Sequence, residues 1–141
     1  MKIRTIVISF AIAVSFVILA ACGRNDSSGA EKTIKSTKTG DTTILLSSAS
    51  GEVKNGENDL TLSFADAAGK SLDVPAASLK FHMPAMGAMA EMNDVATLTT
   101  TDTPGKFKVR VNIEVAGSWE AMISFQGSRG TEHATMSVTA K

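Results

Sequence analysis

The sequence predicts an all-β protein, an immunoglobulin-like antiparallel β-sandwich of about seven or eight strands. Apolar and polar residues alternate with a period of two over several short stretches, which is the pattern of strands with one buried face. Turn residues separate these stretches, and no run of ten or more residues beyond the N-terminal segment carries a helical stripe. About 100 residues, Asp41 to Lys141, are enough for one small core. Paired cysteines of the kind found in true immunoglobulin domains are lacking.

The clearest strand begins at Phe107, where every second residue up to Val115 is apolar and the residues between are mostly charged. A second alternation begins at Trp119, and Ala116–Ser118 is a connection of hairpin length. In chain order, the predicted strands are residues 42–48, 60–64, 72–74, 79–83, 95–101, 107–115, 119–126 and 134–140, with 42–48, 72–74 and 95–101 the weaker candidates.

Residues 1–21 predict a signal peptide that is removed. Lys2 and Arg4 precede an apolar run of about 14 residues, short of the roughly 20 that a membrane-spanning helix needs. The run ends in Leu-Ala-Ala-Cys-Gly, which resembles a bacterial lipobox, so we expect lipid on the sulfur of Cys22, the first residue of the mature chain. The alternatives are a plain secretory signal, or an N-terminal anchor helix with an incidental cysteine.

Lipidation at Cys22 implies attachment to a membrane, since the two or more acyl chains of a lipoprotein give stable anchoring. Gly23 follows the cysteine, where an aspartate commonly retains lipoproteins in the inner membrane. We therefore expect the outer membrane, facing the periplasm, if the cell has two membranes. Cys22 is the only cysteine, so the domain behind it has no disulfide, thiolate ligand or cysteine nucleophile.

Residues 22–40 are expected to be the lipidated cysteine and a polar, flexible linker, with the domain at residues 41–141. Removing residues 1–21 takes away two of the 14 basic residues and no acidic one, which leaves 12 against 14 and a net charge of about −2. That balance gives no reason to expect nucleic acid as a partner.

Four methionines, Met83, Met86, Met89 and Met92, follow one another at intervals of three, and His82 precedes the first. Pro84 and Gly87 interrupt the strand, which predicts a loop or a short helical turn at the edge of the sandwich. Thioether sulfur is a soft ligand that favours Cu(I) or Ag(I), and imidazole suits copper as well. These five residues are therefore the predicted metal ligands.

Two other interpretations of the methionines stay open. Methionine is a flexible core filler, and alternation turns Met83 inward, where it would be core; Met86, Met89 and Met92 could likewise plug one end of the sandwich. An exposed methionine loop could instead be an adaptable surface for protein contacts.

Residues elsewhere give weaker signals. Met122 falls on the outward face of its strand and could join the site. Trp119 could lie over a cation but is more typical of core. His133 with Met136 is a weaker candidate for a second copper-binding pair. No nucleophile, base and orienting residue are grouped, so we do not expect an enzyme.

Four short motifs resemble the YtkA-like/FixH-like family of bacterial exported domains. They are Asp59–Leu62 leading to Ala65–Lys70, then Met83-Pro84-Ala85-Met86-Gly87, Pro104–Phe107, and Gly117–Glu120. The order is that of the family, although Phe107 replaces a common hydroxylated aromatic residue and His82 precedes the methionine. The resemblance implies an immunoglobulin-like sandwich and a setting of copper handling, alongside metal-efflux or oxidase-assembly proteins.

Together these features predict a lipid-anchored protein that binds Cu(I) or Ag(I) for metal tolerance, delivery, or metallation of an oxidase or efflux partner. The alternative is an interaction module without metal, whose methionine loop docks on such a partner.

Overall fold

The computed structural model describes residues 30–141, and this part of the chain folds into nine β-strands without a helix. The strands are β1 (Lys32–Thr39), β2 (Thr42–Ser48), β3 (Gly56–Ala65), β4 (Ala77–Met83), β5 (Met92–Val95), β6 (Thr97–Thr100), β7 (Lys106–Ile113), β8 (Gly117–Gly127) and β9 (Gly130–Ala140). The predicted all-β class is confirmed. The signal peptide and Cys22 lie outside the described residues, within which no helix is long and apolar enough to cross a membrane.

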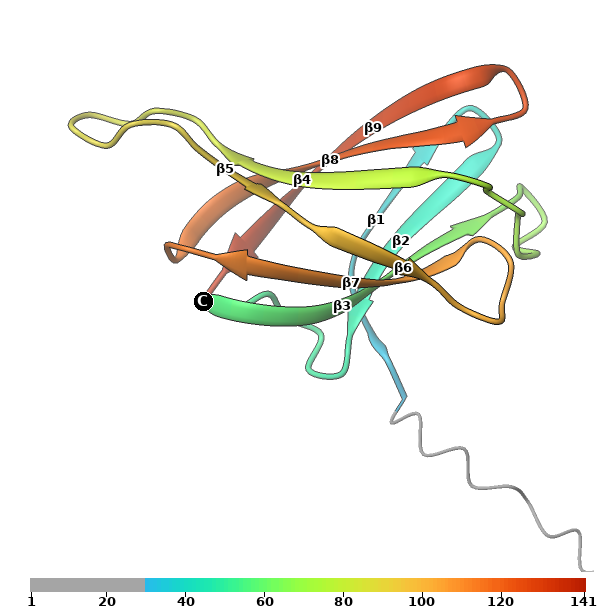
Figure 1. Ribbon diagram of the computed structural model, residues 1–141, viewed down its shortest axis with the longest axis horizontal. Coiled ribbons are helices and arrows are strands. Elements are labelled where there is room, and N and C mark those ends of the chain that lie inside the picture. Colours follow the sequence, from blue (N-terminus) through green and yellow to red (C-terminus); the bar gives the residue numbers. More distant parts are fainter. Residues whose placement is uncertain (1–29) are drawn as a thin grey trace, which may run out of the picture.

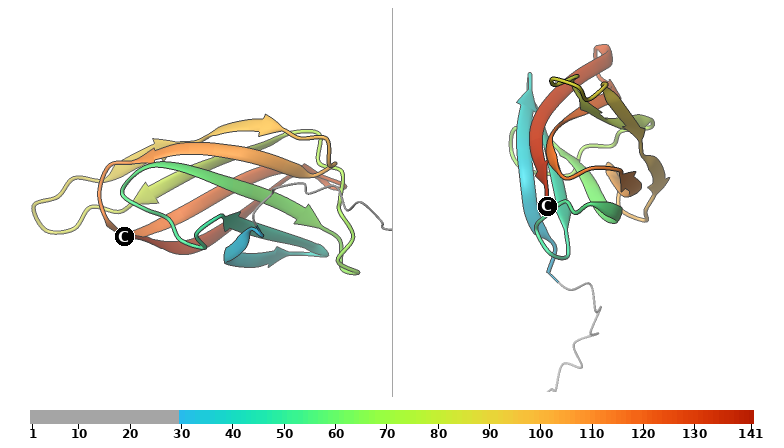
Figure 2. Two further views of the ribbon diagram at one scale, coloured as in Figure 1. Left: turned by 90° about the horizontal axis from the view of Figure 1, so that it is seen from below. Right: turned by 90° about the vertical axis from the view of Figure 1, so that its left-hand side faces the viewer.

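Two antiparallel sheets form the sandwich (Figures 1 and 2). One sheet has five strands in the order β1-β2-β3-β7-β6, and the other has four in the order β5-β4-β8-β9. The chain changes sheets at Ala96, between β5 and β6, where the Ala96 N–H donates to the carbonyl of Leu79 on β4 at 3.0 Å. This crossing divides the predicted 95–101 strand into pieces of two different sheets.

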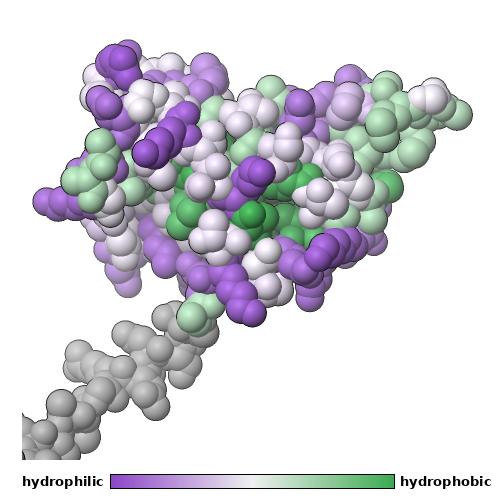
Figure 3. All heavy atoms as spheres, turned by 180° about the vertical axis from the view of Figure 1, so that it is seen from behind, coloured by the Kyte–Doolittle hydropathy of each residue, from purple (hydrophilic) through white to green (hydrophobic). Residues whose placement is uncertain are grey.

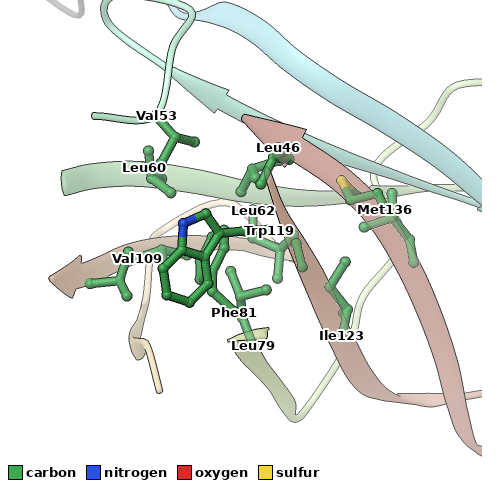
Figure 4. Packing of buried hydrophobic residues seen from close by; sticks show 14 of the residues in the cluster. Leu46, Val53, Leu60, Leu62, Leu79, Phe81, Val109, Trp119, Ile123 and Met136 are labelled. Atoms are coloured by element: carbon green, nitrogen blue, oxygen red, sulfur yellow. The ribbon is translucent and has the colours of Figure 1, made fainter. Parts of the chain in front are cut away.

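The sandwich core comes from the alternating residues that the sequence singles out. In β7, β8 and β9 the inward positions are apolar and buried, and the residues between them are mostly polar and exposed, with the apolar Met122 on β8 the exception. Trp119 is 1% exposed, and its indole N–H donates to the carbonyl of Val115 at 2.9 Å, so the one polar atom of this ring is satisfied. Side chains from both sheets pack around it (Figure 4).

The N-terminal boundary of the domain differs from the prediction. Residues 32–39, expected in a flexible linker, form the edge strand β1, which pairs with β2 from Lys32↔Ser48 to Thr39↔Thr42. An edge strand bonds on one side only and can stay exposed on both faces, so a Lys- and Thr-rich sequence forms it without apolar alternation. The linker prediction is wrong for this stretch, and the sandwich starts before residue 41.

The strand predicted at residues 72–74 is also wrong. Val74 is buried, but the chain here forms no strand: an isolated bridge joins the preceding Ser71 to Ala65, and the Leu72 N–H donates to the Phe64 carbonyl at 3.0 Å. Pro75 follows and cannot donate to a ladder, so the segment crosses the end of the sandwich as a loop.

Candidate functional site

The methionine-rich segment is the tip of a β-hairpin that extends beyond the sandwich (Figures 1 and 2). β4 and β5 pair up to Met83↔Met92, and a further bridge joins Met86 to Met89 in the same register. Met86 N–H donates to the Met89 carbonyl at 3.1 Å, and Met89 N–H donates back to Met86 at 2.9 Å. Gly87, with φ of 58°, occupies the first position of the two-residue turn, where hairpins favour glycine.

The register of this hairpin sorts the four methionines into two pairs. Residues directly opposite one another share a face, and faces alternate along each strand, so Met83 and Met92 lie on one face and Met86 and Met89 on the other. Of the two predicted alternatives, a loop or a short helical turn, the helical turn is therefore wrong. A spacing of three along a strand reverses the face, and Met86 meets Met89 only because the chain turns between them.

Met83 and Met92 form the inner pair. Met83 is 3% exposed in the core, and its terminal methyl lies so close to Gly117 that a Cβ added there would be 3.1 Å away. Met92 is half-buried and packs against the same core. In this conformation both side chains attach the base of the hairpin to the sandwich, which is the core role that alternation predicts for Met83.

Met86 and Met89 form the outer pair at the tip. These residues are 59% and 43% exposed, and the protruding end of the molecule is coloured apolar in Figure 3. Because they exchange both backbone hydrogen bonds, their Cα atoms lie about 5.5 Å apart. Two flexible thioether arms on one face at that separation can converge on a single soft ion.

His82 lies at the base of the hairpin, on β4. Its Nδ1 is 3.0 Å from the Oδ1 of Asn93, its cross-strand partner on β5. Met86 follows His82 by four positions of extended chain, a span of about 13 Å. The five predicted ligands therefore do not converge on one point: the tip brings together two of them, and His82 stands apart.

Most of the weaker candidates have structural roles. Trp119 and Met136 are buried in the core, and His133 Nδ1 lies 2.8 Å from the hydroxyl of Ser124. Met122 is 40% exposed on the outward face of β8, as its place in the alternation predicts. Nowhere in residues 30–141 do three or more His, Cys, Asp or Glu side chains gather as a metal site.

Two carboxylates of the described chain have a lowered pKa, Glu52, which pairs with Lys141, and Glu31. Glu31 accepts a hydrogen bond from the Thr61 hydroxyl, the main cause of the lowered pKa, and the ammonium group of Lys106 lies 3.3 Å away. Glu31 borders an open groove of about 760 Å³ on the five-stranded sheet, but the carboxylate is taken up by these partners. The arrangement fastens the chain before β1 to the sheet.

Sequence reasoning missed Asn93. It is 11 positions from His82 in the sequence, and nothing in the residues around it indicates that it contacts a histidine. Only the pairing of β4 with β5 shows that the two side chains are neighbours.

A nine-strand sandwich with a protruding methionine hairpin defines the class of domain. The chain belongs to the YtkA-like family, whose model matches residues 36–124, more than half of its length. This match confirms the family suggested by the sequence motifs. Searches of curated proteins and of solved structures gave no significant match.

Proposed function

We propose that this YtkA-like protein is exported, anchored to a membrane through lipid on Cys22, and binds Cu(I) or Ag(I) at the tip of the β4–β5 hairpin. The observation that carries the proposal is the exposed pair Met86 and Met89, held opposite each other on one face. Apolar side chains are normally withdrawn from water, and Met86 and Met89 are two of only four large apolar side chains in the described chain that stay well exposed.

The surroundings of the tip support a soft ion over a hard one. Only glycine, alanine and proline accompany the two methionines between Met83 and Glu91, so the tip offers thioether sulfur and no oxygen or nitrogen side-chain ligand. Such a donor set suits Cu(I) or Ag(I) and disfavours zinc or calcium.

Two thioethers leave room on the ion for a further ligand. A protruding tip with an incompletely filled coordination sphere is suited to delivery, because a partner's donor can join before the first ligands leave. We therefore place the protein in metal delivery to an efflux or oxidase-assembly component, or in metal tolerance.

A competition titration tests metal binding. Residues 23–141 contain all nine strands and the whole core, and would be titrated with Cu(I) against a chromophoric Cu(I) chelator. The wild type should withdraw copper from the chelator, and the double variant M86L/M89L should not. M136L is the matched control, since Met136 is a buried methionine on β9 and its replacement should leave copper binding unchanged.

The rival function is metal-free docking of the hairpin tip on a partner protein. Leucine preserves the apolar surface, so M86L/M89L should keep docking while it loses metal. A wild type that never competes with the chelator would refute copper binding by the isolated domain and favour this rival.

A further inference from the structure

The outer face of the four-stranded sheet carries a second set of metal-binding groups, away from the hairpin tip. His82 on β4 lies directly opposite Glu120 on β8, and Lys80 lies opposite Met122. His82 and Met122 are therefore diagonal neighbours on one face, at roughly 7–8 Å, a separation that long side chains can span. Figure 1 shows β4 and β8 side by side along this face.

Asn93 prepares His82 for a ligand. An amide oxygen can only accept, so the 3.0 Å contact between Asn93 Oδ1 and His82 Nδ1 favours the tautomer that carries its proton on Nδ1. Neutral imidazole then presents the Nε2 lone pair. Metal-binding histidines are commonly fixed in this way by a hydrogen bond from the other ring nitrogen.

Met122 supplies the soft partner. It is 40% exposed, one of four large apolar side chains in the described chain that remain well exposed, and alternation holds it outward. The carboxylate of Glu120, across from His82, favours a cation there, whereas the ammonium group of Lys80 beside Met122 opposes it. A monovalent ion bound through nitrogen and sulfur suffers less from Lys80 than a divalent one would.

We propose that His82 Nε2 and Met122 sulfur bind one Cu(I) or Ag(I) ion on the sheet face, with Asn93 as the residue that positions the imidazole. This site is separate from the hairpin tip, because its two ligands come from rigid paired strands and share no residue with Met86 and Met89. It adds a nitrogen-containing site to the thioether-only tip, and the two sites can be tested independently.

The test is a titration of residues 23–141 with Ag(I), which is diamagnetic and stable in air, followed by NMR. Methionine methyl groups labelled with ¹³C give one signal for each of the six methionines after Cys22, and ¹⁵N-labelled histidine reports the ring nitrogens. The Met122 methyl and His82 Nε2 signals should shift together as one binding event. H82Q and M122L should each abolish the shift of the remaining partner.

Asn93→Ala tests the positioning role. It should weaken silver binding at the sheet face by about tenfold and shift the imidazole of the free protein away from the Nδ1–H tautomer, which the ¹⁵N shifts report. The methyl signals of Met86 and Met89 should respond to Ag(I) as in the wild type. Unchanged affinity and an unchanged tautomer in this variant would overturn the positioning role.

The methyl signals separate the two proposals. If Met86 and Met89 shift while Met122 does not, the sheet-face site is refuted and the tip proposal stands. If Met122 shifts without His82, or still shifts in H82Q, the paired site is also refuted. If Met122 and His82 shift while Met86 and Met89 do not, the sheet-face site stands and the tip proposal fails. If none of these signals shifts with Ag(I), both proposals are refuted.

Discussion

Replacing Met83 and Met86 separately by alanine should give opposite results, although both belong to one Met-Pro-Ala-Met motif. Met83 is 3% exposed and packs against the backbone at Gly117, so its truncation leaves a cavity in the core. Buried methionine-to-alanine changes cost 2–5 kcal/mol, and we expect about 3 kcal/mol for M83A. Met86 is 59% exposed, and M86A should stay within about 0.5 kcal/mol of the wild type.

Urea unfolding followed by tryptophan fluorescence measures the difference, since Trp119 lies in the core. With a slope of about 2 kcal/mol per molar urea, M83A should lower the midpoint by about 1.5 M and M86A by less than about 0.3 M. Copper binding should show the reverse order: M86A loses it, while the volume-conserving M83L keeps it. If M83A costs under about 1 kcal/mol and M83L loses copper, Met83 is a ligand and the division of the hairpin into two faces is wrong.

Three further predictions concern the scaffold and its anchor. Gly105→Ala should lower the free energy of unfolding by more than about 3 kcal/mol in the same urea assay, because its Cβ would lie 1.8 Å from the Leu72 carbonyl oxygen. Gly69→Ala is the control: its φ is also positive but no atom lies within 4 Å of the added Cβ, so it should lower the free energy of unfolding by only about 1 kcal/mol. The pKa of Glu31 is lowered by its hydrogen bond from Thr61 and by Lys106, so its contribution to stability is present above the ordinary pKa of a glutamate and should be lost as pH falls through the lowered pKa. Glu31→Gln should flatten that part of the stability–pH curve, and an unchanged curve would contradict the role of this carboxylate. Cys22→Ser should abolish incorporation of labelled palmitate in cells and release the protein from the membrane fraction; retained label would place the lipid elsewhere.

The parts of the fold that could be predicted are those in which local pattern and burial coincide. β7, β8 and β9 each have one face on the core, so every second residue is apolar and the strand is visible in the sequence. β1 was missed because an edge strand is held by backbone pairing, which leaves no apolar period in the sequence. The change of sheet at Ala96 was missed as well. A single residue redirects the chain there, so no turn motif marks the boundary in the sequence.

The candidate site shows the same limit. The sequence identifies the right segment, because methionines with soft sulfur stand out by composition. It cannot tell which of them share a face, since that depends on whether the spacing of three lies on a helix or spans a hairpin. The inward direction of Met83 was predictable from alternation in β4, whereas the pairing of Met86 with Met89 and of His82 with Asn93 required the register.

The incorporation of residues 32–39 into β1 changes how far the domain can travel from its anchor. If Cys22 is lipidated, the sheet starts ten positions after it, at Lys32, a reach of at most about 35 Å. A linker extending to residue 41 would reach about 65 Å, so the volume that the hairpin can search is about sixfold smaller. A short tether raises the local concentration of the hairpin next to the bilayer that holds it. Its metal-accepting partner is then best sought in that same membrane.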